Sequence, residues 1–117
     1  MNEQRQLPRW EVKKKVRVWM PQTGDFVHCT IEDLHLKGMR VSLSRPLPQQ
    51  EPVGMSFVLG DDFEFIKIEA TVPWSRAGEG CYVYGLSFSK IDDRDKDRLY
   101  QYINTHCYDQ IKDKWWA

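Results

Sequence analysis

The sequence lacks any long run of apolar residues. No stretch of its 117 residues approaches the roughly 20 apolar residues that a helix needs to cross a bilayer, so we expect no membrane insertion. The N-terminus lacks the basic and then apolar pattern of a secretory signal, since Asn2, Glu3, Gln4 and Gln6 are polar. These absences predict a cytoplasmic protein.

The sequence also lacks an excess of either charge. It has 17 basic and 17 acidic residues, for a formal net charge of +0. Proteins that bind DNA or RNA generally carry a basic surplus, which neutralises the phosphates. We therefore expect neither DNA nor RNA as a partner.

The sequence has few cysteines, and their spacing does not match a paired motif. The three cysteines, Cys29, Cys81 and Cys107, form no C-x-x-C motif. An odd number without a secretory signal is typical of reduced thiols. We expect all three to be small buried apolar residues.

The histidines do not indicate a metal site or a catalytic one. His28, His35 and His106 are scattered, whereas zinc requires three or four converging ligands, and His106 falls on the apolar face of a predicted helix. Cys29 and His35 lie about 20 Å apart along an extended strand, too far for a nucleophile and its base. We therefore predict no catalytic residues, no metal and no cofactor.

Alternating apolar and polar residues predict a mainly β fold. Hydrophobic residues make up 41% of the chain and charged residues 29%, as in an ordinary single domain. Leu99, Ile103 and Cys107 then follow the spacing of one helix. A small antiparallel barrel or sandwich with a C-terminal helix is expected. The predicted strands cover residues 11–20, 26–31, 38–44, 53–59, 63–75 and 81–88.

Two strands contain an irregularity. Lys14 interrupts the apolar face of the first strand, which predicts a bulge or a late start. Pro73 in the fifth predicts an edge or a bulge. Trp74 is in phase with Ile66 and Ile68 of the same strand, which favours packing in the core.

The stretch from Asp33 to Gly38 separates the second and third strands and is expected to reverse the chain. Aspartate suits a turn because its carboxylate bonds nearby backbone N–H groups. Glycine allows the close approach of a ligand. Asp33 and His35 continue the parity of Ile31, so we expect them on the apolar face of the strand, beyond its end.

Two arginines, Arg5 and Arg9, precede the first strand with three residues between them. Arg-x-x-x-Arg, followed by Asp-x-x-x-x-Gly at the second strand-to-strand turn, resembles the PilZ domain family. The segment Val83–Phe88 and the helix after it resemble the end of that domain. The resemblance implies a flexible arm over residues 1–11. It also implies a six-stranded antiparallel PilZ-type barrel with one C-terminal helix over residues 12–117.

The resemblance to the PilZ family implies cyclic di-GMP as the ligand. The arginine fork matches guanine O6 and N7 as well as phosphate oxygens, and an aspartate can accept from the N1–H and N2–H₂ groups of guanine. The implied binding residues are Arg5, Arg9, Asp33, His35 and Gly38, with His35 where the family usually has serine. Secondary candidates are Lys37, Arg40 and Trp74.

Two functions fit this pattern. The first is a non-enzymatic cyclic di-GMP receptor whose arm reorders on binding and regulates an unidentified protein in motility, attachment, exopolysaccharide output or biofilm formation. The second is an adaptor of PilZ type that does not bind cyclic di-GMP. We expect a monomer or a weak dimer, with the tail Trp115-Trp116 as part of a partner surface.

Overall fold

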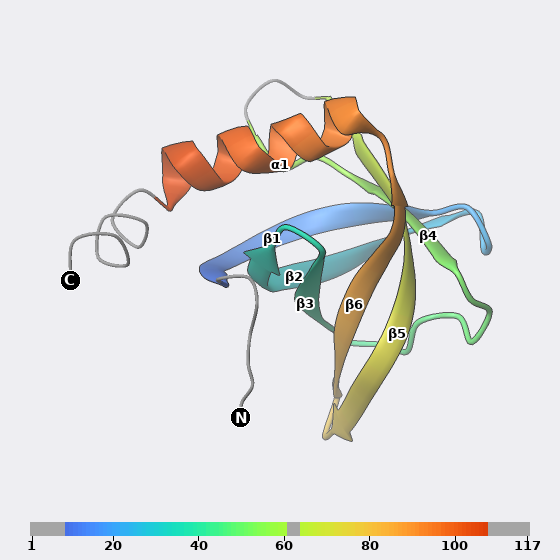
Figure 1. Ribbon diagram of the computed structural model, residues 1–117. Coiled ribbons are helices and arrows are strands. Elements are labelled where there is room, and N and C mark those ends of the chain that lie inside the picture. The colour runs from blue at the N-terminus through green and yellow to red at the C-terminus, as the bar shows by residue number, and fades with distance from the viewer. Residues whose placement is uncertain (1–8, 61–63, 108–117) are drawn as a thin grey trace, which may run out of the picture.

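The alternating stretches form strands that close into a barrel. A computed structural model describes residues 9–60 and 64–107. The barrel order is β1-β2-β3-β6-β5-β4, and all pairs are antiparallel (Figure 1). The predicted six-stranded antiparallel barrel with one C-terminal helix is confirmed. The elements are β1 Trp10–Met20, β2 Asp25–His35, β3 Gly38–Leu43, β4 Val53–Phe57, β5 Ile66–Gly78, β6 Cys81–Ile91 and α1 Asp93–His106.

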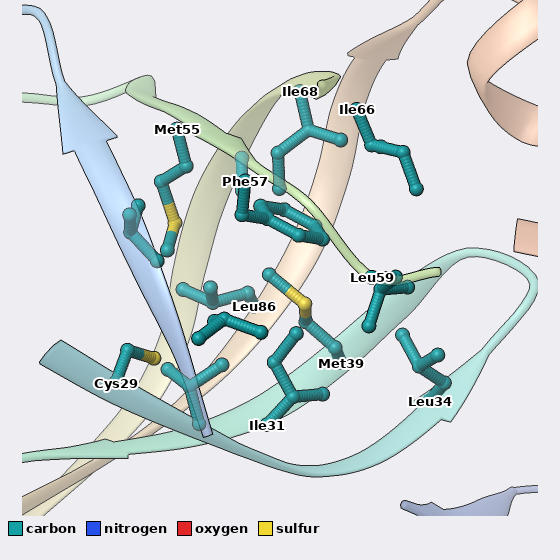
Figure 2. Packing of buried hydrophobic residues seen from close by; sticks show 14 of the residues in the cluster. Cys29, Ile31, Leu34, Met39, Met55, Phe57, Leu59, Ile66, Ile68 and Leu86 are labelled. Atoms are coloured by element: carbon teal, nitrogen blue, oxygen red, sulfur yellow. The ribbon is translucent and has the colours of Figure 1, made fainter. Parts of the chain in front are cut away.

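One face of each strand fills the barrel. Figure 2 shows side chains from β2, β3, β4, β5 and β6 meeting in one apolar cluster. Phe57 and Ile31 are fully buried, and Met39 and Met55 lie beside them. The alternation of apolar residues places one side of every strand in this cluster, which stabilises the barrel by removing apolar surface from water.

Helix α1 lies across one end of the barrel (Figure 1). Leu99 and Ile103 are buried in the core cluster, at the i, i+4 spacing of one helix face. Asp95 accepts a hydrogen bond of 3.3 Å from the backbone N–H of Lys67 at the start of β5. The helix is therefore fixed to the barrel by both apolar packing and a polar contact.

The last turn of α1 differs from the prediction. His106 is exposed, and its ring stacks on Tyr102 with centroids 4.2 Å apart. The predicted core position for His106 is wrong: from Asp93 to Cys107 the buried residues are Asp95, Leu99, Ile103 and Cys107, and the ring of His106 packs on Tyr102 instead.

Barrel closure is uneven. β1 and β2 pair along most of their length, as do β5 and β6. Between β1 and β4, in contrast, the paired residues are Trp19 and Ser56 alone. The ring is thus closed at this seam by one pair among the described residues.

Four strands contain bulges, and the one in β6 lies between Phe88 and Lys90, opposite Ala70 and Glu69 of β5. In β1 the register shifts between Glu11 and Lys14, and Lys13 has a φ of 51°, which confirms the irregularity predicted at Lys14. In β5 it shifts between Thr71 and Trp74, so the predicted irregularity at Pro73 is a bulge. The bulge in β2 determines the candidate site.

Several boundaries differ from those expected. β1 begins at Trp10, one residue before the predicted strand start, so Trp10 belongs to the barrel and not to the arm. β5 begins and ends three residues later than predicted and continues to the turn Glu79–Gly80, and β6 continues three residues past its predicted end, to Ile91. Strand pairing continued the ladder through polar residues that sequence alternation alone did not recognise.

Candidate functional site

The turn between β2 and β3 is shorter than predicted. β2 continues to His35, which pairs with Gly38, and only Leu36 and Lys37 lie between them. Asp33 is therefore a strand residue. The prediction of a reversal over the whole of residues 33–38 is wrong because ladder pairing extends β2 by four residues beyond Ile31.

A bulge turns Asp33 to the outside of the barrel. Ile31 pairs with Val41 in β3, whereas Asp33 pairs with Arg40, the neighbour of Val41. Neighbouring strand residues point to opposite faces, and cross-strand partners share a face. The extra residue, Glu32, thus reverses the parity of the strand. The predicted common face for Ile31 and Asp33 is wrong.

A row of residues crosses four strands on this outer face. Asp33 of β2 pairs with Arg40 of β3, and Arg40 also pairs with Gly85 of β6. Gly85 in turn pairs with Trp74 of β5. Three predicted site residues, Asp33, Arg40 and Trp74, therefore lie in one row, with Gly85 between Arg40 and Trp74.

The carboxylate of Asp33 is buried and only partly satisfied. Its Oδ2 lies 3.1 Å from Nε of Arg40. Asp33 is only 7% exposed, and its Oδ1 has no hydrogen-bond partner among the described residues. Leaving a buried acceptor unpaired costs about 1–3 kcal/mol. A ligand with an N–H donor would remove this penalty.

His35 lies against Gly38. A Cβ built on Gly38 would lie 2.1 Å from the backbone oxygen of Leu86 and 3.0 Å from Nε2 of His35. Only glycine fits between the imidazole and β6 at this position. The imidazole of His35 thus packs directly on Gly38.

Trp74 lies outside the core. It is 40% exposed, and a Cβ built on Gly85 would lie 2.2 Å from its Nε1. The indole therefore lies directly over Gly85. Its predicted core packing is wrong because the bulge between Thr71 and Trp74 reverses the parity of β5.

These residues surround a shallow hollow. Its volume is about 130 Å³, and Arg9, Asp33, His35, Arg40 and Trp74 are among the residues that line it. Arg9 is exposed. Enclosed sites for small ligands measure roughly 300–1,000 Å³, so a dinucleotide would rest on this surface and need a cover.

The remaining predicted residues are not seen to line the hollow. Lys37 is exposed at the turn, and its carbonyl accepts from the N–H of Phe88 at 2.9 Å. It is not among the residues that line the hollow. Arg5 and the tail Trp115-Trp116 lie outside the described residues.

The sequence reasoning missed Gly85 and Ser87, which also line the hollow. Gly85 lies in the middle of β6, and a glycine inside a strand often marks the close approach of another group. That signal was present in the sequence. The contact of Ser87 with the hollow depends on its pairing with Gly38, which only the register shows.

Other features of the described residues are less informative. A larger hollow of about 430 Å³, lined by Lys15, His28 and Cys81 among others, shares no residue with the predicted site. No group of three or more His, Cys, Asp or Glu in the described ranges could hold a metal ion. None of the described helices is both long and apolar enough to span a membrane.

Comparison with known proteins identifies the domain type. The family model of the PilZ domain matches residues 3–105. No curated protein is significantly similar in sequence.

Two solved structures share the fold. The inhibitor of motility MotI/DgrA of Bacillus subtilis has a TM-score of 0.67 and 20% identity, covering 97% of this chain and 54% of that one. PlzA of Borreliella burgdorferi, solved in complex with c-di-GMP, has a TM-score of 0.55 and 20% identity, covering 85% of this chain and 40% of that one. The chain thus spans about half the length, or less, of both.

Proposed function

The chain belongs to the PilZ domain family, and from that membership we propose that it is a non-enzymatic receptor for cyclic di-GMP. The ligand would lie on the outer face of β2, β3, β6 and β5. PlzA, which has a related fold, was solved with this dinucleotide. The observation that carries the proposal is the buried Oδ1 of Asp33, which borders the hollow without a hydrogen-bond partner among the described residues.

The chemistry of the hollow suits a guanine. The N1–H and N2–H₂ groups of guanine are two adjacent donors, and a carboxylate accepts both. Charge-assisted hydrogen bonds of this kind are worth about 1.5–3 kcal/mol. Arg9 and Arg40 supply guanidinium groups at the same hollow, and their forks match phosphate oxygens or guanine O6 and N7. Trp74 offers an exposed ring for stacking.

The N-terminal arm would cover the ligand. The hollow is shallow, and Arg9 stands where the arm joins β1. We propose that Arg5 and Arg9 close over the dinucleotide and that this changes the surface offered to a partner protein. The name of MotI/DgrA as an inhibitor of motility is consistent with an output in motility, and attachment or exopolysaccharide output are further candidates. A cytoplasmic location follows from this role.

Arg9→Ala tests the clamp. Isothermal titration of the wild-type protein with cyclic di-GMP should give a saturable signal that GTP does not give. The Ala variant should lose about 1.5–3 kcal/mol of binding free energy, or roughly ten- to a hundredfold in affinity, because it lacks the guanidinium group that contacts the ligand. Because Arg9 is exposed, the melting temperature of the variant should stay unchanged.

Arg17→Ala is the matched control. Arg17 is exposed, as Arg9 is, but it lies within β1 and does not line the hollow. The Arg17→Ala variant should bind as the wild type does. Normal binding by Arg9→Ala, or unfolding of that variant, would refute the clamp. A flat titration with the wild-type protein would refute the receptor.

A second function, that of an adaptor without cyclic di-GMP, is favoured by one observation. The imidazole of His35 packs on Gly38 at the rim of the hollow, where the family usually has a small serine. If the wild-type titration is flat, His35→Ser distinguishes a blocked site from an absent one. Recovered binding would identify His35 as the obstruction.

A further inference from the structure

The outer half of β5 has an unpaired edge. β4 pairs with β5 only from Ile66 to Ala70. Beyond that point β5 continues to Gly78 and pairs with β6 on one side alone among the described residues. Residues 73–78 are all exposed, and the end of the β5–β6 hairpin extends past the rest of the barrel (Figure 1). Such an edge is a template for another strand.

The hairpin turn shows which backbone groups face this edge. Gly78 and Cys81 pair across the turn Glu79–Gly80, and residues that flank a two-residue turn form a hydrogen-bonded pair. Hydrogen-bonded and non-bonded pairs then alternate along an antiparallel ladder. Arg76 and Trp74 therefore bond to β6, whereas Ser75 and Ala77 direct their N–H and C=O groups outward.

Self-pairing of this edge favours one register. When two copies pair antiparallel with Ser75 opposite its counterpart, the backbone N–H of each serine donates to the backbone carbonyl of the other. The N–H of Ala77 in each copy also donates to the carbonyl of Pro73 in the other copy. In this register the carbonyl of Ala77 lacks a donor, because it faces Pro73, which has no N–H. The register also places Trp74 opposite Arg76 of the other copy, which is a favourable cation–π pair. A shift of the centre to Arg76 would instead oppose two like charges.

We propose that two copies of this chain pair through the β5 edge, centred on Ser75, and that the partner subunit's Arg76 joins the binding surface. Trp74 ends the row of Asp33, Arg40 and Gly85, and the partner subunit's Arg76 extends it by one position. The guanidinium then lies beside the indole on which a base would stack. The effect on ligand affinity rests on the proposed function, whereas the pairing itself does not.

The dimer is weak and is strengthened by ligand. A stable interface buries about 1,200–2,000 Å², and a short strand edge provides less. Cyclic di-GMP carries two phosphates, so an added cation increases its affinity. Because binding and association are reciprocally linked, the ligand must tighten the dimer by the same factor.

The test is sedimentation velocity on the full chain, from low micromolar to several hundred micromolar, with and without cyclic di-GMP. The wild-type protein should pass from monomer to dimer with concentration, and the ligand should tighten association by about tenfold. Ser75→Pro removes an outward N–H and leaves the β6 ladder intact, so it should remain monomeric. Ser75→Ala keeps the N–H and should dimerise as the wild type does.

Arg76→Glu separates the two parts of the proposal. Without ligand it should dimerise more weakly than the wild type, because the cation–π pair with Trp74 is lost, and it should show no tightening by ligand, whereas Arg76→Lys should retain both. A monomeric wild-type protein at every concentration, together with normal ligand titration, would overturn the dimer and leave the receptor standing. Unimpaired dimerisation by Ser75→Pro would overturn the β5 edge as the interface. Should Ser75→Pro fail to fold, Ala77→Pro tests the same edge, with the same monomeric outcome expected.

Discussion

Gly38 has no room for a side chain. The nearest atom to a Cβ added at this position would be the backbone oxygen of Leu86, at 2.1 Å, and a backbone atom cannot move aside as a flexible side chain can. Gly38→Ala should therefore lower the free energy of unfolding by about 1–3 kcal/mol, as measured by urea denaturation. It should also weaken cyclic di-GMP binding, because β3 and β6 both contribute to the hollow.

Gly78→Ala is the control for this prediction. A Cβ at Gly78 would lie 4.0 Å from the backbone oxygen of Cys81, an ordinary contact, so its urea midpoint should stay close to that of the wild type. Equal urea midpoints for Gly38→Ala and Gly78→Ala would contradict the prediction, since the backbone of β6 at Leu86 would then have moved to make room for the added Cβ.

At the residue scale the sequence predicted several of the residues that the hollow brings together, but not the strand faces on which Asp33 and Trp74 lie. Aspartate, arginine and glycine are recognisable by type and spacing. The faces of Asp33 and Trp74 were not predictable from alternation, because each follows a bulge that adds a residue to the strand. Pro73 indicated the irregularity in β5 but not its effect on the face of Trp74, and nothing in the chemistry of Glu32 marks the extra residue in β2.

At the scale of the elements, α1 is held to the segment before β5 by a carboxylate. Glu64 accepts hydrogen bonds from Arg98 and from Arg94, the latter at 2.6 Å. The hydrogen bond from Arg98 and its charge hold the pKa of Glu64 below its usual range. Arg98 also donates to the carbonyl of Phe65 at 3.4 Å. The arginines thus connect the helix to the start of β5.

Glu64→Gln should show this connection in its pH dependence. Because the pKa of Glu64 is lower in the folded chain, its contribution to stability is present above the unfolded pKa of about 4.3. That contribution is lost as the pH falls through the folded value. Melting temperatures of wild type and Glu64→Gln should therefore differ modestly at neutral pH and converge in acid. A constant difference across this range would contradict the prediction.

Strands and helix were predictable because each has a strong period. The six strands and the final helix follow from alternation of period two and from the spacing of Leu99 and Ile103. Their ends were not predictable to the residue, since pairing with a neighbouring strand extends β2 and β6 through polar residues such as His35 and Ser89.

At the scale of the whole molecule, the thiols report the folded state. Cys29 and Cys107 are buried and Cys81 is exposed, so the expectation of three buried cysteines was wrong for Cys81, which follows the exposed hairpin turn. Burial, with a smaller contribution from Glu32, raises the pKa of Cys29 to about 12. Burial also raises the pKa of the Cys107 thiol. Only thiolates are reactive, so two of the thiols are protected by the fold.

A disulfide reagent such as DTNB should therefore modify Cys81 rapidly in the native protein, and Cys29 and Cys107 only as the barrel opens. Cys81→Ser should leave no fast phase, and all thiols should react at once in concentrated urea. A fast phase that persists in Cys81→Ser would show that the barrel or the α1 end opens readily.

The seam between β1 and β4 gives the molecule an uneven response to thermal fluctuation. The barrel closes there through the pair Trp19 and Ser56, whereas the strands β2, β3, β6 and β5 are joined by long ladders. Amide hydrogens near the seam should exchange with solvent first, through local opening that leaves the other ladders intact. A dinucleotide bound across those four strands would then be held by the slowest-exchanging part of the chain, and its dwell time would not depend on the breathing of the barrel.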